Sequence, residues 1–370
     1  DPDAIVFGIG FTGVTLERID AYLARGNLDY TDALDVHLYG SVISEEQCLD
    51  YLQSEMKRRG KIRPIWTTEM GSWHRDQDAL CQEMVKKHVT AFACGVHRAE
   101  WHAFGTPEWN REASMWRYYW GFREPWLSSA FLAAEVQPRY FVPFEKVGTY
   151  YNLVRHLDYV EPRNRFTYGE DVRVYAFDRD GERVYGVWQL PSATGTGRSL
   201  AINTTSSVTV IDAYGRQVEL NPGRYGRVAF PVSLRPRLVS VQGSPGQPCG
   251  DAFDPVHFGK NRDDLVFRPG PFQVEYTTPS GDQPVTLTVQ VTNTFAQAFR
   301  GRLQVELDDT WRLEPAQTRV DLPPGKSLTT RFTLRPETEK APGTYAVKLL
   351  LRDDEGILPA FSEVHFTLGQ

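Results

Sequence analysis

The chain has 370 residues, which is more than one hydrophobic core usually serves, so two or three domains are expected. Its formal net charge is -6 and no stripe of lysine and arginine stands out, which argues against a nucleic-acid partner. Aromatic residues make up 12% of the chain, with nine Trp and seventeen Tyr. Such a share suits surfaces that stack on flat ligands, and it equally suits aromatic-rich cores.

The four cysteines, Cys48, Cys81, Cys94 and Cys249, stand far apart without a C-x-x-C pair. Neither a zinc site nor a disulfide framework is indicated, and isolated buried thiols are expected. No run reaches the length of a membrane span, and the first residues lack the charged start and long apolar stretch of a signal peptide. The chain reads as beginning inside a domain, so this start says little about its compartment.

From residue 4 to about residue 105, short apolar runs alternate with amphipathic helical segments. Helix follows strand each time, which predicts parallel strands joined by helices. Gly26 suits the end of the first helix, and Ser44 with Gln47 suits a capping box at the start of the second. Strands are expected at 4–10, 33–40, 62–71 and 89–101, and helices at 17–26, 44–60, 76–88 and, after an aromatic insertion at 109–126, 144–160.

Four strand-helix units form half of an eightfold barrel, and a doubly wound sheet is the competing arrangement. A glycine-rich phosphate turn would favour the doubly wound sheet, and the chain has none. We therefore expect residues 1–160 to form half of a (β/α)8 TIM barrel.

Beyond residue 165 the pattern changes to alternating strands broken by Gly, Pro, Asn and Asp. Residues 171–190 read as a hairpin around an Asp-Gly turn and 208–220 as another, which predicts a small β-sandwich domain at 161–245. A Gly- and Pro-rich linker is expected at 246–269. Turn signals about every ten residues predict an immunoglobulin-like β-sandwich at 270–370, with alternating runs at 284–295, 301–309, 326–334 and 343–353.

Glu69 is the sharpest candidate for chemistry. It follows the apolar run of the third strand and precedes Gly71 by two residues. In an α/β barrel the carboxyl ends of the strands form the catalytic rim. A Glu at a strand end is more often a solvated or salt-bridged residue, so the functional interpretation depends on its neighbours.

The segment PIWTTEMGSW around Glu69 resembles the seventh strand of the large clan of retaining glycoside hydrolases with (β/α)8 barrels, which presents the nucleophile. One strand earlier, DALDVHLYG resembles the sixth strand, whose His and Tyr, here His37 and Tyr39, line the pocket. One strand later, GVHRAEWHAF places Trp101 where the clan commonly has a Trp under the sugar. The resemblance implies that Glu69 is the nucleophile, that Tyr39 and His37 position it, and that Trp101 is a sugar platform.

Structural roles stay open for these residues. Tyr39 and His37 can satisfy each other inside a barrel, and Trp101 can simply fill the core. The aromatic insertion at 109–126 would lie after the eighth strand and either build substrate subsites or cover the barrel edge. Further side chains on or near the rim can touch sugar hydroxyls: Glu100, Trp73, His102, Trp66 and His74.

Retaining hydrolysis needs a second carboxyl group about 5 to 5.5 Å from the nucleophile. In the clan it is a Glu preceded by Asn at the end of the fourth strand, and this chain contains no Asn-Glu pair. The resemblance therefore implies that residues 1–160 are strands five to eight and that the acid/base lies in a missing amino-terminal half. The fragment alone would be inactive, and its open edges would pair with that half or with a second copy. Met70 stands where Phe, Tyr or Trp is also seen, which casts some doubt on the family.

The order of barrel, small β-domain and immunoglobulin-like tail is similar to xylosidase-, iduronidase- and arabinofuranosidase-type enzymes. The expected activity is cleavage of the O-glycosidic bonds of an oligosaccharide, polysaccharide or glycoside by double displacement, without a metal or organic cofactor. A secreted or periplasmic location is expected rather than a cytoplasmic one. The alternative is a non-catalytic carbohydrate-binding or scaffold protein with a decayed barrel, while an ester hydrolase is disfavoured because no G-x-S-x-G elbow occurs.

Overall fold

The computed structural model describes most of the chain, and the statements below concern those residues. They are 5–11, 13–72, 74, 76–102, 116–119, 140–143, 145–168, 171–190, 198–243, 267–277, 284–307, 310–337 and 343–368. Within these ranges no helix is both long and apolar enough to cross a membrane. Cys48, Cys81 and Cys94 are buried, as predicted. Cys249 and nearly all of the predicted linker and aromatic insertion lie outside the described residues.

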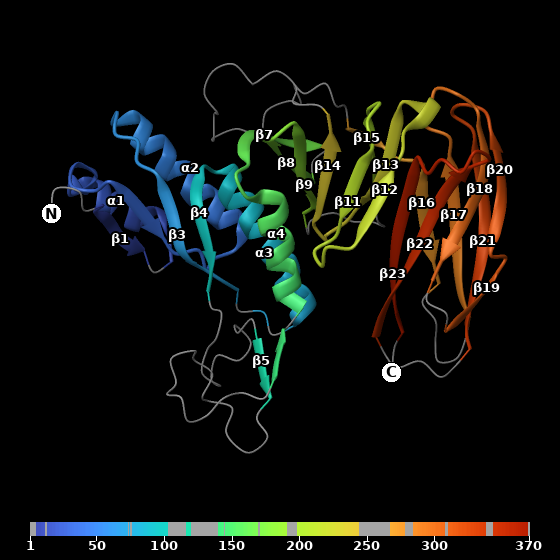
Figure 1. Cartoon of the computed structure of the whole chain (residues 1–370), viewed down its shortest axis with the longest axis horizontal. Helices are drawn as coiled ribbons and strands as arrows, with labels where there is room; N and C mark the ends of the chain where they lie inside the picture. Colours follow the sequence, from blue (N-terminus) through green and yellow to red (C-terminus); the bar gives the residue numbers. More distant parts are fainter. Residues whose placement is uncertain are drawn as a thin grey trace.

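The first part of the chain is a parallel sheet whose strands alternate with helices, which confirms the predicted alternation (Figure 1). The sheet has the order β1-β2-β3-β4, and each pair is parallel. Its strands are β1 (Phe7–Phe11), β2 (Ala33–Val36), β3 (Ile65–Met70) and β4 (Val96–Trp101). The helices are α1 (Leu16–Ala24), α2 (Val42–Arg58), α3 (Gln77–Ala93) and α4 (Glu145–Leu157), with a short 3-10 turn η1 (Asn27–Asp29).

Two predicted boundaries are wrong. The N-cap of α2 is Ser41, whose side chain accepts a hydrogen bond from the Ser44 backbone, so the predicted Ser44–Gln47 box lies inside the helix. Residues 89–93, predicted as the start of the fourth strand, complete α3 instead. A short, mostly buried and mostly apolar run carries no period that separates strand from helix. The helix ends at Ala93, and Gly95, just beyond the C-cap Cys94, adopts φ 75 and supplies the left-handed residue that closes it.

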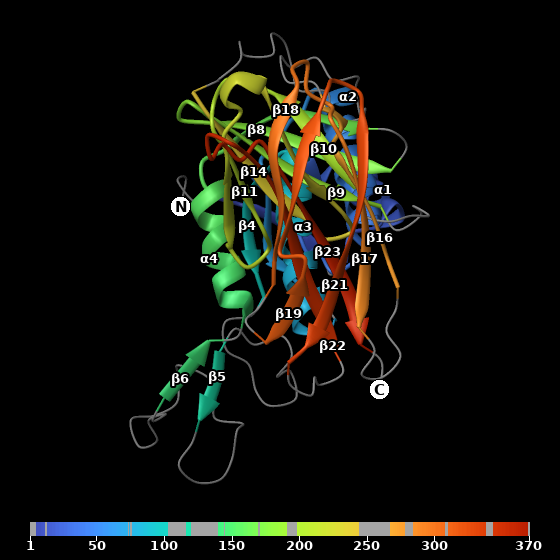
Figure 2. The ribbon, with the colours of Figure 1, turned by 90° about the vertical axis from the view of Figure 1, so that its right-hand side faces the viewer.

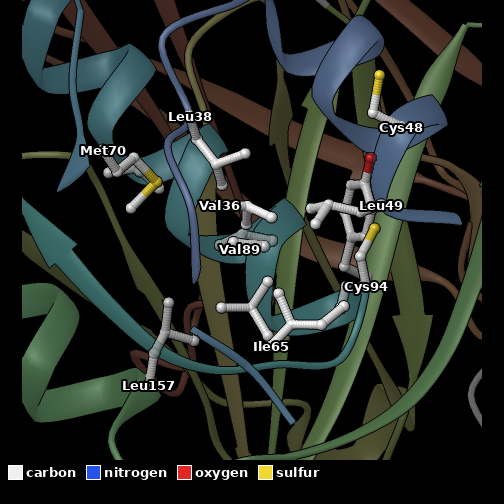
Figure 3. Packing of buried hydrophobic residues seen from close by; sticks show 14 of the residues in the cluster. Val36, Leu38, Cys48, Leu49, Ile65, Met70, Val89, Cys94 and Leu157 are labelled. Carbon is white, nitrogen blue, oxygen red and sulfur yellow. The ribbon is translucent and has the colours of Figure 1, made fainter. Parts of the chain in front are cut away.

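The helices cover one face of the parallel sheet in the described part of the chain. Consecutive helices contact each other, and side chains such as Val36 and Ile65 are buried beneath them (Figure 3). On the opposite face Phe7 lies against Trp66 with ring centroids 4.8 Å apart, and the Arg98 guanidinium lies 5.1 Å above the Trp66 ring. A doubly wound sheet carries helices on both faces, so this one-sided cover favours the wall of a barrel.

Helices α2 and α3 lie between the parallel sheet and an antiparallel sheet of order β12-β11-β14-β9-β8-β7 (Figure 1). Gly186 of that sheet lets α3 approach closely, because a Cβ there would lie 2.4 Å from Val89. One apolar cluster runs from Ile65 through Val89 to Phe177 and Trp188, so the three layers share a core. The strands are β7 (Glu161–Tyr168), β8 (Val172–Arg179), β9 (Glu182–Gln189), β11 (Val208–Ile211), β12 (Gln217–Leu220) and β14 (Arg237–Gln242).

Both predicted hairpins of this region are confirmed. Strands β8 and β9 pair around Asp180 and Gly181, whose φ values are 37 and 79. Two consecutive residues with positive φ are the backbone that an Asp-Gly turn supplies. Strands β11 and β12 form the second hairpin.

The carboxyl-terminal part is two facing antiparallel layers around a separate apolar cluster (Figure 2). One sheet has the order β16-β17-β21-β19, and the strands β20, β18, β22 and β23 face it. The four predicted runs form β17 (Val285–Thr292), β18 (Phe299–Glu306), β21 (Ser327–Pro336) and β22 (Gly343–Asp353). Four further strands, which were not predicted from the sequence, complete the two layers: β16 (Phe272–Tyr276), β19 (Trp311–Glu314), β20 (Gln317–Leu322) and β23 (Ala360–Leu368).

One sheet crosses from the middle of the chain into this last part. Its order is β15-β10-β13-β23-β22-β18-β20, and the crossing pairs Ala229 of β13 in parallel with Ala360 of β23. Leu350 and Phe361 also belong to the apolar cluster of the middle part. The remaining strands are β10 (Arg198–Asn203), β13 (Arg227–Val232) and β15 (Phe267–Pro269), with a 3-10 turn η3 (Gly223–Tyr225) and a separate pair β5 (Trp116–Tyr119) and β6 (Tyr140–Pro143).

Candidate active site

Glu69 lies at the carboxyl end of β3, where the chain after β2 runs alongside it. The Leu38 backbone N–H donates to the Glu69 carbonyl at 2.9 Å, and Leu38 forms an isolated parallel bridge with Met70. This pairing brings the side chains of residues 37 and 39 next to Glu69. The Glu69 side chain is 39% exposed, so solvent and a ligand can reach it.

Tyr39 donates its phenolic hydrogen to Glu69 Oε2 at 2.9 Å. Partial burial, together with the hydrogen bond to Glu69 and its negative charge, raises the pKa of Tyr39, so the phenol stays a neutral donor. Gly71 makes room for the ring, because a Cβ at this position would lie 2.8 Å from Tyr39 Cε1. The backbone after Glu69 is therefore shaped around the tyrosine that binds its carboxylate.

His37 stands between two carboxylates. Its Nδ1 lies 3.3 Å from Glu69 Oε2, and its Nε2 lies 3.3 Å from Asp35 Oδ2. Asp35 in turn accepts from the Thr68 backbone N–H at 3.0 Å and from the Thr68 hydroxyl at 2.8 Å. The sequence reasoning missed Asp35 and Thr68, although residues 35, 37 and 39 alternate on one face of a strand and so were a detectable set.

Trp101 does not lie where a sugar platform was expected. Its side chain is 4% exposed and its ring stacks on His88 with centroids 5.8 Å apart and an interplanar angle of 22°. Burial lowers the pKa of His88 to about 4, so the partner ring is a neutral aromatic surface. The structure places Trp101 in the hydrophobic core, where its ring offers no face to a sugar.

The weaker candidates lie apart from Glu69 or make other contacts. Glu100 pairs with Arg98 at 2.9 Å on the open face of the parallel sheet, the face that the helices do not cover. His74 is 57% exposed and pairs with Glu83 at 3.2 Å. His102 meets the edge of the Tyr39 ring with centroids 6.3 Å apart and so borders the site. Trp66 lies on the open face against Phe7 and Arg98, and Trp73 is outside the described residues.

The geometry gives Glu69 two unequal oxygens. Oε2 receives Tyr39 and faces His37, whereas Oε1 has no hydrogen-bond partner among the residues the structure describes. A carboxylate fixed through one oxygen and accessible through the other can attack an electrophilic carbon or accept a proton.

Comparison with solved structures gives likenesses to glycoside hydrolases at low identity. An endoxylanase of family GH30 from Clostridium papyrosolvens is 13% identical with a TM-score of 0.44, and the match covers 65% of this chain and 57% of that one. A xyloglucanase of family 44 from Paenibacillus polymyxa is 13% identical with a TM-score of 0.36, covering 66% of this chain and 58% of that one. A β-glucuronidase from Bacteroides uniformis is 16% identical with a TM-score of 0.22, covering 52% and 27%. The chain thus spans less than two thirds of the length of each.

The comparison of sequences gives one regional match. Residues 279–353 match the family described as the NPCBM-associated, NEW3 domain of alpha-galactosidase. This segment runs from just before β17 to the end of β22, within the carboxyl-terminal layers. No curated protein matches the chain.

Proposed function

We propose that this chain carries the nucleophile of a retaining glycoside hydrolase. One observation carries the proposal: Tyr39 donates to Glu69 Oε2 at 2.9 Å while Glu69 remains 39% exposed at the carboxyl end of a parallel strand. Double displacement requires an ionised carboxylate that is held still and can reach an anomeric carbon. Tyr39 stabilises the ionised form by donating to it, and the unpartnered Oε1 is the attacking atom.

We place the acid/base outside the described residues. Asp35 contacts the same His37 as Glu69, but its carboxylate is 13% exposed and bound by Thr68, so it cannot protonate a leaving group. The outer edges of β1 and β4 pair with no further strand in the described part of the chain. An amino-terminal half-barrel that pairs with these edges would complete the rim and supply the second carboxyl group, and a second copy of the chain is the alternative partner.

The proposed substrate is an O-glycoside within an oligosaccharide or polysaccharide. The match of residues 279–353 to a domain family described from alpha-galactosidase supports a carbohydrate setting. The proposal leaves Trp101 out, because a buried ring cannot be a sugar platform. A xylosidase-, iduronidase- or arabinofuranosidase-type activity remains the finer form of this proposal.

Covalent labelling tests the nucleophile directly. The full-length protein that contains this chain is incubated with activated 2-deoxy-2-fluoro xyloside and glucoside probes, and the peptide carrying Glu69 is analysed by mass spectrometry. We expect a glycosyl adduct on Glu69, and we expect Glu69→Gln to lose both the adduct and turnover by about 10⁴- to 10⁶-fold, the scale for loss of a nucleophile. Glu100→Gln is the matched control and keeps both.

The same experiment separates the alternative from a different class, a non-catalytic carbohydrate-binding or scaffold protein. In that case the wild type and Glu69→Gln bind polysaccharide equally well and neither forms an adduct. An adduct on another carboxylate would support a retaining glycoside hydrolase but would show that Glu69 is not its nucleophile.

A further inference from the structure

We propose that Asp35 is a positioning residue for Glu69, acting through His37 and Thr68; this inference rests on the proposed function of Glu69. Asp35 lies on β2 and makes no direct contact with Glu69 among the described residues. Its carboxylate instead contacts two side chains that flank the nucleophile, His37 just after β2 and Thr68 on β3.

The first route runs through the imidazole. Asp35 Oδ2 and His37 Nε2 are 3.3 Å apart, and His37 Nδ1 and Glu69 Oε2 are also 3.3 Å apart. A carboxylate can only accept hydrogen bonds, so the contact with Asp35 favours a proton on Nε2. The Glu69 carboxylate likewise favours a proton on Nδ1, so the ring bridges Asp35 and Glu69 when both of its nitrogens carry a proton.

The second route runs through the backbone. The Thr68 N–H and hydroxyl both donate to Asp35, at 3.0 and 2.8 Å, and Thr68 immediately precedes Glu69 in the chain. This bidentate contact fixes the peptide from which the Glu69 side chain projects. Asp35 therefore holds the nucleophile by its backbone and, through His37, by its carboxylate.

The site leaves space for this arrangement and offers Asp35 no competing cation. A Cβ at Gly10 would lie 3.0 Å from both Asp35 Oδ2 and His37 Nε2, so β1 approaches the pair closely because residue 10 is glycine. No lysine or arginine pairs with Asp35 among the described residues. A carboxylate that is 13% exposed needs its donors, and here the donors are Thr68 and His37.

The isosteric change Asp35→Asn makes the inference testable. With the amide oxygen on the Thr68 N–H, the amide NH₂ faces His37 Nε2 and donates to it, so Nε2 loses its proton and the imidazole beside Glu69 loses its positive charge. We expect kcat of the full-length protein, and its rate of adduct formation with a 2-fluoro glycoside, to fall on the order of 10²-fold, the scale of a slightly misplaced reacting group. KM should change little, because Asp35 does not face the substrate.

Asp32→Asn is the matched control. Asp32 lies just before the same strand and accepts from the Val6 backbone N–H at 2.9 Å, at the end of the strand remote from Glu69. It should leave kcat unchanged. If Asp35→Asn fails to fold, Thr68→Val replaces it: this change removes the hydroxyl donor, keeps the shape of the side chain, and should lower kcat about tenfold.

A ¹⁵N NMR spectrum of the histidine side chains tests the inference without a measurement of turnover. In the wild type His37, identified by its loss in His37→Gln, should show a protonated Nε2, and in Asp35→Asn that nitrogen should shift to the range of an unprotonated one. A protonated Nε2 in both proteins, or an unchanged kcat in Asp35→Asn, would overturn the inference. If the wild type forms no adduct and turns over no glycoside, the proposed function fails, and the ¹⁵N result still decides whether Asp35 sets the proton of His37.

Discussion

Glu69 at the rim and Glu46 at the contact of α2 with β7 are the same residue type with similar partners. Glu69 binds Tyr39 through Oε2, and Glu46 accepts from Tyr175 at 3.1 Å and from Arg165 at 3.2 Å. The difference is access, since the Glu69 side chain is 39% exposed and that of Glu46 is 8% exposed. Burial raises the pKa of Glu46 although its cationic and phenolic neighbours oppose this.

This difference teaches that a tyrosine bound to a carboxylate does not by itself mark a reactive site. The same pair serves to attach one layer of the fold to another when it is sealed between a helix and a sheet. What singles out Glu69 is its place at the open end of a parallel strand. Variants at the exposed Glu69 site and at the buried Glu46 site should therefore differ in what they lose.

The largest effect is expected at the buried cluster. Arg165 is 1% exposed and lies 3.2 Å from Glu46 and 2.9 Å from Asp50. Arg165→Met should lower the free energy of unfolding by about 3–5 kcal/mol, because the buried Glu46 and the half-buried Asp50 lose their cation. Urea denaturation followed by circular dichroism measures this. Arg58→Met, which breaks the exposed pair with Glu55, should leave the unfolding midpoint nearly unchanged, and equal losses in both variants would contradict the contrast drawn here.

A third carboxylate extends the contrast to acid pH. Glu363 of β23 lies 2.8 Å from Arg237 of β14 and 2.7 Å from His365. Burial acts to raise its pKa, but His365 and Arg237 outweigh burial and lower it from 4.5 to about 2. The lowered pKa stabilises the fold above pH 4.5, and this stability is lost as the pH falls toward 2.

The variant Glu363→Gln isolates that contribution. The wild type should be more stable than the variant by about 3 kcal/mol at neutral pH, and the difference should shrink across the acid window. Denaturation midpoints between pH 7 and pH 2 measure it. Glu355→Gln is the control, because Glu355 is exposed. If the stability difference between the wild type and Glu363→Gln did not depend on pH, the pairing of Glu363 would not be electrostatic.

At the rim the expected loss is in rate rather than in stability. Tyr39→Phe removes the donor to Glu69 and keeps the ring beside Gly71. A hydrogen bond to a charged group is worth about 1.5–3 kcal/mol, so kcat/KM of the full-length protein should fall about 10- to 10²-fold. Tyr51→Phe is the matched control, because Tyr51 donates to Asp20 on the exposed surface of the helices. Unchanged kinetics in Tyr39→Phe would place Glu69 with the merely structural carboxylates.

The smallest effect is expected away from both regions. Gly148 lies in the interior of α4 with nothing within 4 Å of an added Cβ. Gly148→Ala should therefore raise the free energy of unfolding by about 0.8–1 kcal/mol through helix propensity, with kinetics unaltered. Thermal unfolding followed by circular dichroism measures it, and a loss of stability would mean that α4 has neighbours outside the described residues.

Local chemistry made much of this fold predictable. The Asp180-Gly181 turn fixed one hairpin, and the strand-helix alternation up to α3 followed from apolar periodicity. The position of Glu69 at a strand end was also readable. Asp35 was missed although it alternates with His37 and Tyr39, whereas its contact with Thr68 of another strand is not recorded by any spacing along the chain.

Burial accounts for the main errors. The mostly apolar residues 89–93 suit a buried strand as well as a buried helix, and the structure shows that they complete α3, with Val89 packed against Gly186 of β9. Trp101 stands at the right position on its strand for a platform, but its ring turns to His88 and into the core. The pairing of β13 with β23 joins residues more than a hundred positions apart, which turn signals cannot reveal.

That pairing bears on whether the last part of the chain can be exchanged for another domain. A tail attached only through a linker can be gained, lost or exchanged between proteins without harm to what precedes it. Here Leu350 and Phe361 of the tail fill the interior of the preceding sheets, and Ala360 continues their hydrogen bonding. Replacement of the last hundred residues would therefore open a hole in the part of the chain that precedes them.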